Sequence, residues 1–415
     1  MALAAPTTMA SRSLPHDARA APPPPRAIGT ARIAGLDIGV MFMGSTLVTP
    51  LYGLYREKFG FSELVLTLVY AAYVVGNLVA LFLFGRVSDQ VGRRRASLPA
   101  MALGALAMLV FLCADATGWL FVARVLSGLA IGVATGTGTA WVTELVPGGD
   151  KARSSSLATS ANLAGIAAGP LLAGVLADAF RAPLRTPFIA YLLLLAFSAI
   201  LVARLPETVR APARLREVSF KPRLGVPKEI RAAFFPPAVA AFADFAVGGY
   251  YAGLMPRVVA DLGVSSLSVV GAIVALLYGM GSLAVIAMRR STSRNAMLWG
   301  LVLLLPGIGG LLVAKALASI AVLAASSAIG GVGFGLCYRG TLQVVNGIAP
   351  DDKRAEVLSS FMIACFLGNS LPVVGVALLS QATSGATAQF AFAGMVTVLA
   401  IVAFATGWRW VPKDE

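Results

Sequence analysis

The chain has 415 residues, of which 58% are hydrophobic and only 13% are charged, and its mean hydropathy is +0.82. This composition excludes a soluble globular protein, which would expose far more charge, and indicates a polytopic membrane protein. The net charge of +14 does not indicate a nucleic acid partner, because most basic residues fall in segments expected in the cytosol, as the positive-inside rule requires.

Residues 1–29 contain several arginines, the proline run Pro22–Pro25 and no apolar core. Because a signal peptide needs such a core, this segment is predicted to be a disordered cytosolic tail. It also holds the single histidine, His16, so proton handling inside the membrane must use carboxylates. The three cysteines fall in separate predicted spans, without disulfide or metal-ligand spacing: Cys113, Cys337 and Cys365. We therefore expect no bound metal.

Twelve segments of about 20 mostly apolar residues are long enough to span a membrane. The sequence therefore predicts an all-α membrane protein with both termini in the cytosol. We expect an N-terminal bundle of six helices at residues 30–205, a basic cytosolic linker at 206–231 and a C-terminal bundle of six at 232–415. The spans are expected to begin near Thr30, Leu64, Arg95, Trp119, Ser155, Pro187, Phe234, Ser266, Asn295, Leu317, Ala355 and Ala386.

Matching residues recur in the two sets of six helices at one constant spacing. The matched pairs are Gly128 and Gly330, Asp150 and Asp352, and Pro170 and Pro372. Near the start of each set, an aspartate (Asp37 or Asp244) also precedes a proline by about the same distance. A repeat of this kind predicts two structurally related halves.

A short charged loop, Gly85–Arg95, joins the second and third predicted spans. Three consecutive arginines cannot sit in hydrocarbon, so the loop is expected in the cytosol. It resembles the glycine–acid–glycine–arginine loop of the major facilitator superfamily, which joins the second and third helices of that family. The matching residues are Gly85, Asp89, Gly92, Arg93 and Arg94, whereas Gln90 stands where the family usually has a basic residue.

This resemblance implies two pseudo-symmetric six-helix halves with the substrate site between them near the middle of the membrane. It implies a secondary transporter of small molecules that works by alternating access, as a functional monomer surrounded by membrane lipid. No glycine loop ending in Lys-Ser or Lys-Thr occurs, so we expect a proton gradient as energy source and no cofactor. The alanine- and arginine-rich composition suggests a bacterial cytoplasmic (inner) membrane.

Arg124 lies about one turn into the fourth predicted span and is followed by Gly128 and Gly132. This four-residue glycine spacing lets another helix approach closely. It resembles the arginine-then-glycine pattern of the family's fourth helix, which implies a part in proton transfer. The alternative is an arginine that snorkels to the outer interface. Arg339 in the tenth span is expected to snorkel to the cytosolic boundary, with substrate binding as the weaker alternative.

The fifth predicted span carries Gly165, Gly169, Pro170 and Gly174. The glycines create a flat face for tight packing, and the proline removes a backbone hydrogen bond. This pattern is similar to the helix-5 pattern of exporters in the family that exchange solute for protons, although the adjacent glycines that usually close it are missing. Ordinary small-residue packing is the alternative.

Asp37 in the first span and Asp244 in the seventh lie roughly 10–12 Å into the membrane at 1.5 Å per residue. A charged carboxylate at such depth costs about 2.5–3.5 kcal/mol, so acids there are functional by default. The resemblance places both, with Arg124, at a cavity where a proton or a cationic substrate is exchanged. For Asp37, which lies near Arg32, the alternative is a wet cytosolic vestibule.

Glu144 stands at the cytosolic end of the fourth span. The resemblance implies that Glu144 joins Asp89 and Arg93 in a charge network that latches the halves together when the cavity faces outward. A solvated charged surface is the alternative, and we favour it for Arg153 and Glu356.

The favoured function is proton-coupled export of a drug or metabolite. An uptake symporter of the same fold is the close alternative, and only the helix-5 pattern argues against it. A polytopic membrane enzyme is a third possibility. It is disfavoured because the predicted spans contain no histidine and no clustered acids or cysteines.

Overall fold

The computed structural model describes residues 27–84, 87–209 and 224–412, and every regular element within them is helical. The first half comprises α1 (Ala27–Thr46), α3 (Glu63–Phe84), α5 (Arg93–Cys113), α6 (Thr117–Leu145), α7 (Lys151–Ala179) and α8 (Thr186–Ala203). The second half comprises α9 (Arg231–Asp261), α10 (Leu267–Ala287), α11 (Ser293–Ala316), α12 (Ile320–Ile348), α13 (Arg354–Ala382) and α14 (Gly385–Trp410). Shorter helices are η1 (Thr49–Leu51), α2 (Tyr52–Phe59), α4 (Val87–Val91), η2 (Pro147–Gly149) and η4 (Lys228–Ile230).

Twelve helices in the described part of the chain are long and apolar enough to cross a membrane, which confirms the predicted spans. Each begins within about one turn of its predicted start. The first span runs on from α1 through η1 and α2 to Phe59. The predicted loop after the second span contains the short helix α4, while Gly85, most of the predicted tail and the middle of the predicted linker lie outside the described residues.

Several helix starts are fixed by polar side chains that accept a backbone N–H bond. In the second half these N-caps are Ser266 of α10, Thr292 of α11, Ser319 of α12 and Ser384 of α14. Each cap satisfies one of the N–H groups that the first turn leaves without an intrahelical partner. Short polar residues therefore set these boundaries, and their effect is local.

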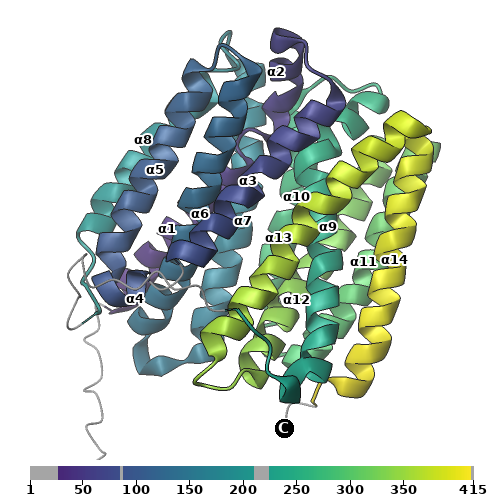
Figure 1. Ribbon diagram of the computed structural model, residues 1–415. Coiled ribbons are helices and arrows are strands. Elements are labelled where there is room, and N and C mark those ends of the chain that lie inside the picture. The colour runs from purple at the N-terminus through teal and green to yellow at the C-terminus, as the bar shows by residue number, and fades with distance from the viewer. Residues whose placement is uncertain (1–26, 85–86, 210–223, 413–415) are drawn as a thin grey trace, which may run out of the picture.

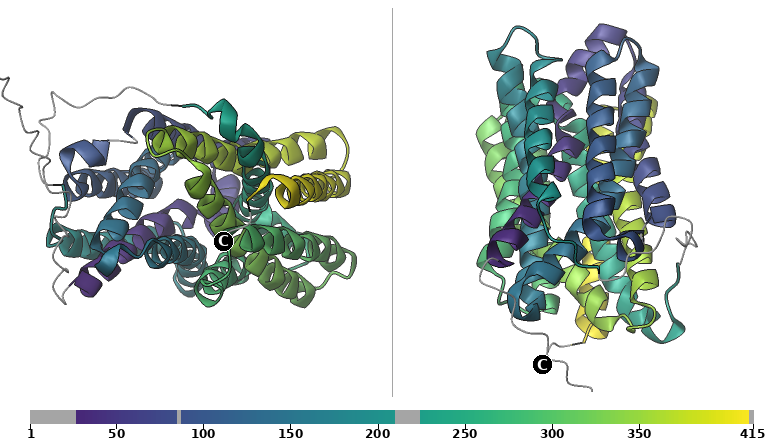
Figure 2. Two further views of the ribbon diagram at one scale, coloured as in Figure 1. Left: turned by 90° about the horizontal axis from the view of Figure 1, so that it is seen from below. Right: turned by 90° about the vertical axis from the view of Figure 1, so that its left-hand side faces the viewer.

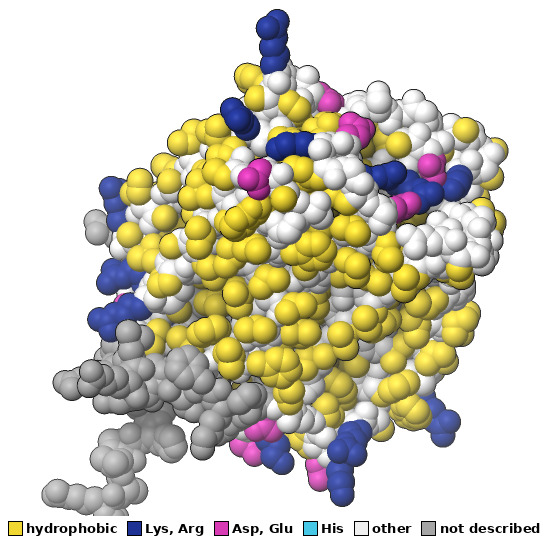
Figure 3. All heavy atoms as spheres, turned by 45° about the horizontal axis from the view of Figure 1, so that its top comes forward, with side chains coloured by type: hydrophobic (Ala, Val, Ile, Leu, Met, Phe, Trp, Pro, Cys, Tyr) yellow, Lys and Arg dark blue, Asp and Glu magenta, His cyan; other side chains and the backbone are white. Residues whose placement is uncertain are grey.

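The two groups of six helices stand side by side (Figure 1; Figure 2, left). Chain direction alternates, so α4 and the end of α14 lie at the same end of the bundle (Figure 1). Large apolar side chains on the outer surface remain exposed, among them Leu193 at 68% and Val398 at 60%. Hydrophobic side chains cover the side of the molecule, while charged side chains gather toward its two ends (Figure 3). This belt is the surface of a multi-pass membrane protein.

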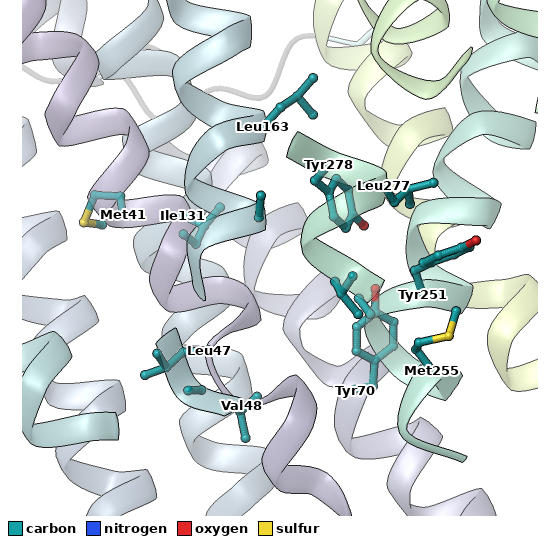
Figure 4. Packing of buried hydrophobic residues seen from close by; sticks show 14 of the residues in the cluster. Met41, Leu47, Val48, Tyr70, Ile131, Leu163, Tyr251, Met255, Leu277 and Tyr278 are labelled. Carbon is teal, nitrogen blue, oxygen red and sulfur yellow. The ribbon is translucent and has the colours of Figure 1, made fainter. Parts of the chain in front are cut away.

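The largest hydrophobic cluster is continuous across both halves. It combines Leu47 and Val48 of the first half with Tyr251, Met255 and Leu277 of the second (Figure 4). The halves are therefore in direct apolar contact over part of their length. Any cavity between them must lie at another level along the bundle.

Candidate functional site

A cavity of about 1200 Å³ lies between the two halves. It is lined by α1, α3, α6 and α7 of the first half and by α12, α13 and residues 289–293 of the second. The lining reaches Glu144 near the end of α6 and Arg354 at the start of α13, at the end of the bundle that carries α4. We name this the open end and the opposite one the closed end. A cavity of this size holds a small organic molecule.

Polar contacts join the two halves between the inner limit of the cavity and the closed end. The Nδ2 group of Asn369 on α13 donates to the hydroxyl oxygens of Tyr70 at 2.7 Å and Tyr73 at 2.8 Å, both on α3. Arg257 on α9 forms an ion pair with Glu63 at the start of α3. These contacts tie α3 to both α13 and α9, and they accompany the continuous apolar cluster.

Asp178, in the last turn of α7, binds the start of α10 in the other half. Its carboxylate accepts hydrogen bonds from Ser266 Oγ at 2.7 Å, Leu267 N at 3.1 Å and Ser268 N at 2.8 Å. It therefore caps a helix that is not its own. Asp178 was not among the residues predicted from the sequence. One feature of the sequence could have pointed to it: the acid lies at the C-terminal end of its own helix, where the helix dipole disfavours a negative charge.

The helix-5 glycines face two different neighbours. A Cβ at Gly165 or Gly169 would collide with backbone atoms of α1, and a Cβ at Gly174 would collide with the start of α10. A Cβ at Gly271 of α10 would in turn meet the Pro170 carbonyl. The predicted flat face is confirmed as a packing surface, and its closed-end part forms contact between the halves.

Pro170 lies inside α7, which continues through it. Because proline has no N–H, the carbonyl of Ile166 four residues earlier lacks its usual helical partner. The hydroxyl of Thr46 on α1 donates to this carbonyl at 2.9 Å. The neighbouring helix thus satisfies the group that the proline leaves free, as the hydrocarbon interior demands.

Arg124 on α6 is 1% exposed, so the alternative that it snorkels to the outer interface is wrong. Its guanidinium donates to the carbonyls of Ser45 at 2.8 Å and Tyr70 at 3.3 Å, and its Cζ lies 4.7 Å from the ring centre of Tyr73. The glycines that follow it do admit a neighbouring helix, which is α3. Arg124 is therefore fixed at the contact of α1, α3 and α6.

Asp37 on α1 is 2% exposed, so it does not lie in a wet vestibule. Its Oδ2 accepts a hydrogen bond from Ser97 Oγ of α5 at 2.7 Å, while its Oδ1 has no hydrogen-bond partner. It also interacts electrostatically with Tyr191 of α8. Asp37 thus faces helices of its own half.

Asp244 on α9 is 0% exposed, and neither carboxylate oxygen has a hydrogen-bond partner. It lies near enough to interact electrostatically with four side chains of the second half: Tyr278, Cys337, Tyr338 and Cys365. Asp244 is therefore buried among helices of the second half, as Asp37 is buried among helices of the first. Neither acid, nor Arg124, is among the residues that line the cavity in this conformation.

At the open end, Arg93 joins two acids of the first half. Its guanidinium forms an ion pair with Asp89 of α4 and another with Glu144 of α6, the latter at 2.5 Å. Arg93 is 6% exposed. The three residues that the resemblance grouped are thus in contact within one half, and their part in a latch between the halves stays a prediction.

Gly92 and Arg94 complete this region. Gly92 has a φ of 109°, a backbone conformation that favours glycine, and it precedes the first turn of α5. The Glu207 carboxylate accepts the backbone N–H groups of Arg93 at 2.7 Å and Arg94 at 3.2 Å. The Arg94 guanidinium donates to the carbonyls of Ala203 and Leu205 at the end of α8. Glu207 belongs to a segment, Pro206–Thr208, that resembles the one after the sixth helix of the family, but its partner could not be predicted because α5 is distant in sequence.

Arg339 on α12 is 2% exposed, and its guanidinium reaches the segment that follows α10 at the open end, so its place near the cytosolic boundary stays a prediction. Its terminal nitrogens donate to the carbonyls of Met288, Arg289 and Ser291 at 2.6–3.0 Å, and to Ser291 Oγ at 2.9 Å. These groups follow the end of α10, so Arg339 holds the turn between α10 and α11 in place. It is also one of the residues that line the cavity.

Comparisons with known proteins agree with this architecture. The chain superposes on the D-xylose-proton symporter with a TM-score of 0.75, 15% identity and coverage of 93% of this chain and 98% of that one. It superposes on the human organic anion transporter MFSD10 (TETRAN) with a TM-score of 0.69, 16% identity and coverage of 92% and 100%. At these identities the likeness shows the fold alone.

Among curated proteins, the arabinose-proton symporter of Bacillus subtilis (strain 168) is 26% identical over 124 residues, which is 30% of this chain and 27% of that protein. The match thus spans about a quarter of that relative's length. A sequence model of the family described as Major Facilitator Superfamily matches residues 38–371, which is well over half of the chain. The chain therefore belongs to the Major Facilitator Superfamily, and it is a multi-pass secondary transporter of that superfamily.

Proposed function

We propose that this protein moves a small molecule across a bacterial cytoplasmic membrane by alternating access, coupled to the proton gradient. The observation that carries the proposal is a cavity between the halves that reaches one end of the bundle, while contacts between the same halves close the other end. For the cavity to face the other side, the halves must rock so that the closed-end contacts break and open-end contacts form.

We place the open end in the cytosol. Arg93 and Arg94 lie at this end, as do the exposed Arg289 and Arg290 at the cavity rim, and clusters of basic residues favour the cytosolic side. The end of α14 lies there too (Figure 1). In this conformation the cavity then faces inward. We further propose a monomer that works without a cofactor.

Asp244 is the proposed proton carrier. A buried carboxylate without hydrogen-bond partners is strongly disfavoured in its charged form, so this conformation suits a protonated acid. Tyr338 lines the cavity and belongs to the buried side chains around Asp244, so movement of Tyr338 is the proposed route by which water reaches the acid. Loss of the proton would then favour a conformation in which the carboxylate finds polar partners.

Two directions of coupling have separate support. Export by proton antiport is supported by the helix-5 pattern, which resembles that of exporters and in which Pro170 and Gly174 pack against α10 of the other half. Uptake by proton symport is supported at least as well, since the partly matching relative and one of the two superposed structures are named as proton symporters. The drug-exporting assignment is thus one of two candidates.

The experiment reconstitutes the purified full-length protein in liposomes that contain a pH-sensitive dye and screens a panel of labelled compounds. An imposed proton gradient should drive uphill movement of the substrate, and substrate added without a gradient should move protons. If protons and substrate move in opposite directions, the protein is an antiporter, and if they move in the same direction, it is a symporter. Uphill movement that persists after a protonophore collapses the gradient contradicts proton coupling in either direction.

A further inference from the structure

We propose that the cavity binds organic anions, in the form of a carboxylate on an apolar body, and that Arg339 sets the positive potential that selects them. The inference rests on the proposed function, because it names the substrate class of the same cavity. It is carried by the distribution of charge around the cavity and by the burial of one arginine without an acidic partner.

Basic residues dominate the lining of the cavity. Among the residues that the structure describes, the charged ones that line the cavity are Arg289, Arg290, Arg339, Arg354 and one acid, Glu144. Glu144 is already bound by Arg93 at 2.5 Å, so its charge is compensated within the first half. Arg354 is paired with Asp351 at 2.7 Å. Three positive charges therefore remain on the wall formed by the second half, and no unpaired acid faces them from the described part of the lining.

The positive-inside tendency explains only part of this charge. Arg289 and Arg290 are exposed at the rim after α10, where basic residues are common whatever the substrate. Arg339 differs, because it lies within α12, nine residues before its end at Ile348, and is 2% exposed. At 1.5 Å per residue it stands roughly 13 Å from that end. Its guanidinium reaches back to the segment that follows α10 and is buried against it, whereas Arg289 and Arg290 are exposed.

The charge of Arg339 is held in place but not neutralised. Its four terminal N–H groups are used by three carbonyls and one hydroxyl, none of which carries a net charge. None of the ion pairs among the described residues includes Arg339, and its Nε has no hydrogen-bond partner. A buried cation without a counter-ion is costly, so a negative ligand nearby would be strongly favoured.

The remainder of the lining suits an apolar body. Phe42 of α1 and Met362 and Phe366 of α13 line the cavity on the side away from the rim. Low-dielectric walls of this kind concentrate the field of the few charges present. An amphipathic anion can place its apolar part among these side chains and its carboxylate toward Arg339 and the rim arginines. A cation of the same shape would meet the same positive potential and be repelled.

The test uses the full-length protein in lipid nanodiscs and matched carboxylate, alcohol and amine versions of three apolar bodies: phenylbutyl, cyclohexylpropyl and naphthylethyl. Binding is measured by calorimetry at low and moderate salt. At least one carboxylate should bind tenfold or more tightly than its alcohol and amine. Equal or tighter binding of the amines, or no carboxylate binding at all, overturns the proposal.

Variants then assign the effect to residues. Arg339→Gln should weaken carboxylate binding at least fivefold and leave alcohol binding unchanged. The matched control is Arg294→Gln, since Arg294 is also buried in the second half but lies outside the cavity lining, where it donates to the Trp408 carbonyl at 2.6 Å. This control should change carboxylate binding less than twofold. An equal loss in both variants contradicts the role of Arg339.

Because Arg339 also binds the end of α10, its substitution can impair folding, and a second variant avoids this risk. The double variant Arg289→Gln and Arg290→Gln changes only exposed residues. It should weaken carboxylate binding by two- to threefold and lower its dependence on salt. An unchanged affinity and salt dependence contradicts the positive cavity. Carboxylate binding without any proton-driven movement would instead retain the anion site and overturn proton-coupled transport.

Discussion

The carboxylate of Asp178 on α7 accepts the backbone N–H of Ser268 on α10 at 2.8 Å, and so joins the two halves at the closed end. Gly174 lies four residues earlier on the same face of α7, where the start of α10 packs directly against it. The glycine and the acid therefore act on the same segment, one through close packing and one through charge. Both contacts must break when the closed end opens.

Asp178→Ala should shift the protein toward the conformation that is open at this end. Loss of a helix N-cap costs about 1 kcal/mol, which corresponds to about a fivefold shift of the equilibrium. The measurement is the labelling rate of a cysteine placed at Val48, which is 1% exposed in the closed end. A water-soluble maleimide should react about five times faster in the variant.

Asp150→Ala is the matched control, because Asp150 also caps a helix but does so within the first half, where it accepts Arg153 N at 2.9 Å. It should lower thermal stability without a change in labelling at Val48. If both variants label equally fast, Asp178 stabilises a helix rather than a conformation of the transporter.

Thr46→Val should destabilise the protein by about 1–3 kcal/mol, because the Ile166 carbonyl then loses the hydroxyl that replaces the N–H that Pro170 lacks. Thermal unfolding in detergent measures the effect. Thr67→Val is the control, since the buried Thr67 hydroxyl donates to Leu64 of its own helix. Adding Pro170→Ala restores the missing N–H and should recover most of the loss. No recovery would contradict this account.

Gly169→Ala should impair folding or transport, because the new Cβ would overlap the backbone of α1, and overpacking of this kind costs about 1–3 kcal/mol. Gly375→Ala in α13 has no atom within 4 Å of its new Cβ and should be neutral.

Leu371→Gly changes a side chain that is 56% exposed and should be tolerated, in contrast to Gly169→Leu at the matching position. Yield and transport rate are compared, and similar losses at both positions argue against a special role for α7.

Combining Asp89→Asn with Arg93→Ala should leave the protein inserted but largely inactive, with substrate affinity in detergent near that of the wild type. The reason is that these residues lie at the open end, where the halves must meet during switching. Since Arg93 is buried, Arg93→Lys serves as a milder variant that keeps the charge. A large loss of affinity with the maximal rate retained would assign the loop to binding instead.

Asp244→Asn should abolish proton-driven uphill transport while retaining downhill substrate exchange. The amide mimics the neutral acid, so the halves can still rock, but no proton leaves at that step. Asp37→Asn should affect coupling less, because Ser97 already binds one of its oxygens. Proton release from purified protein and transport in vesicles are measured for each variant. Normal proton release and uphill transport by Asp244→Asn would favour Asp37 or Arg124 as the carrier.

The twelve spans could be predicted from the sequence, because a membrane helix satisfies its own backbone and needs only an apolar segment of sufficient length. The positions at which helices start also depend on nearby residues, as the N-caps Ser266 of α10 and Thr292 of α11 show. The charged loop also predicted the family. Asp37, Asp244 and Arg124 could be singled out because charge inside a span is costly wherever its helix packs.

Only the tertiary structure decided which way these side chains face. Lipid-facing and protein-facing sides of a membrane helix are both apolar, so hydrophobic periodicity does not mark the face that meets a neighbour. For this reason the sequence did not reveal that Asp37 and Asp244 face their own halves, or that Arg124 is held by the carbonyls of Ser45 and Tyr70. The capping of α10 by Asp178 depends in the same way on how the two halves meet, because its partners lie in a different half of the chain.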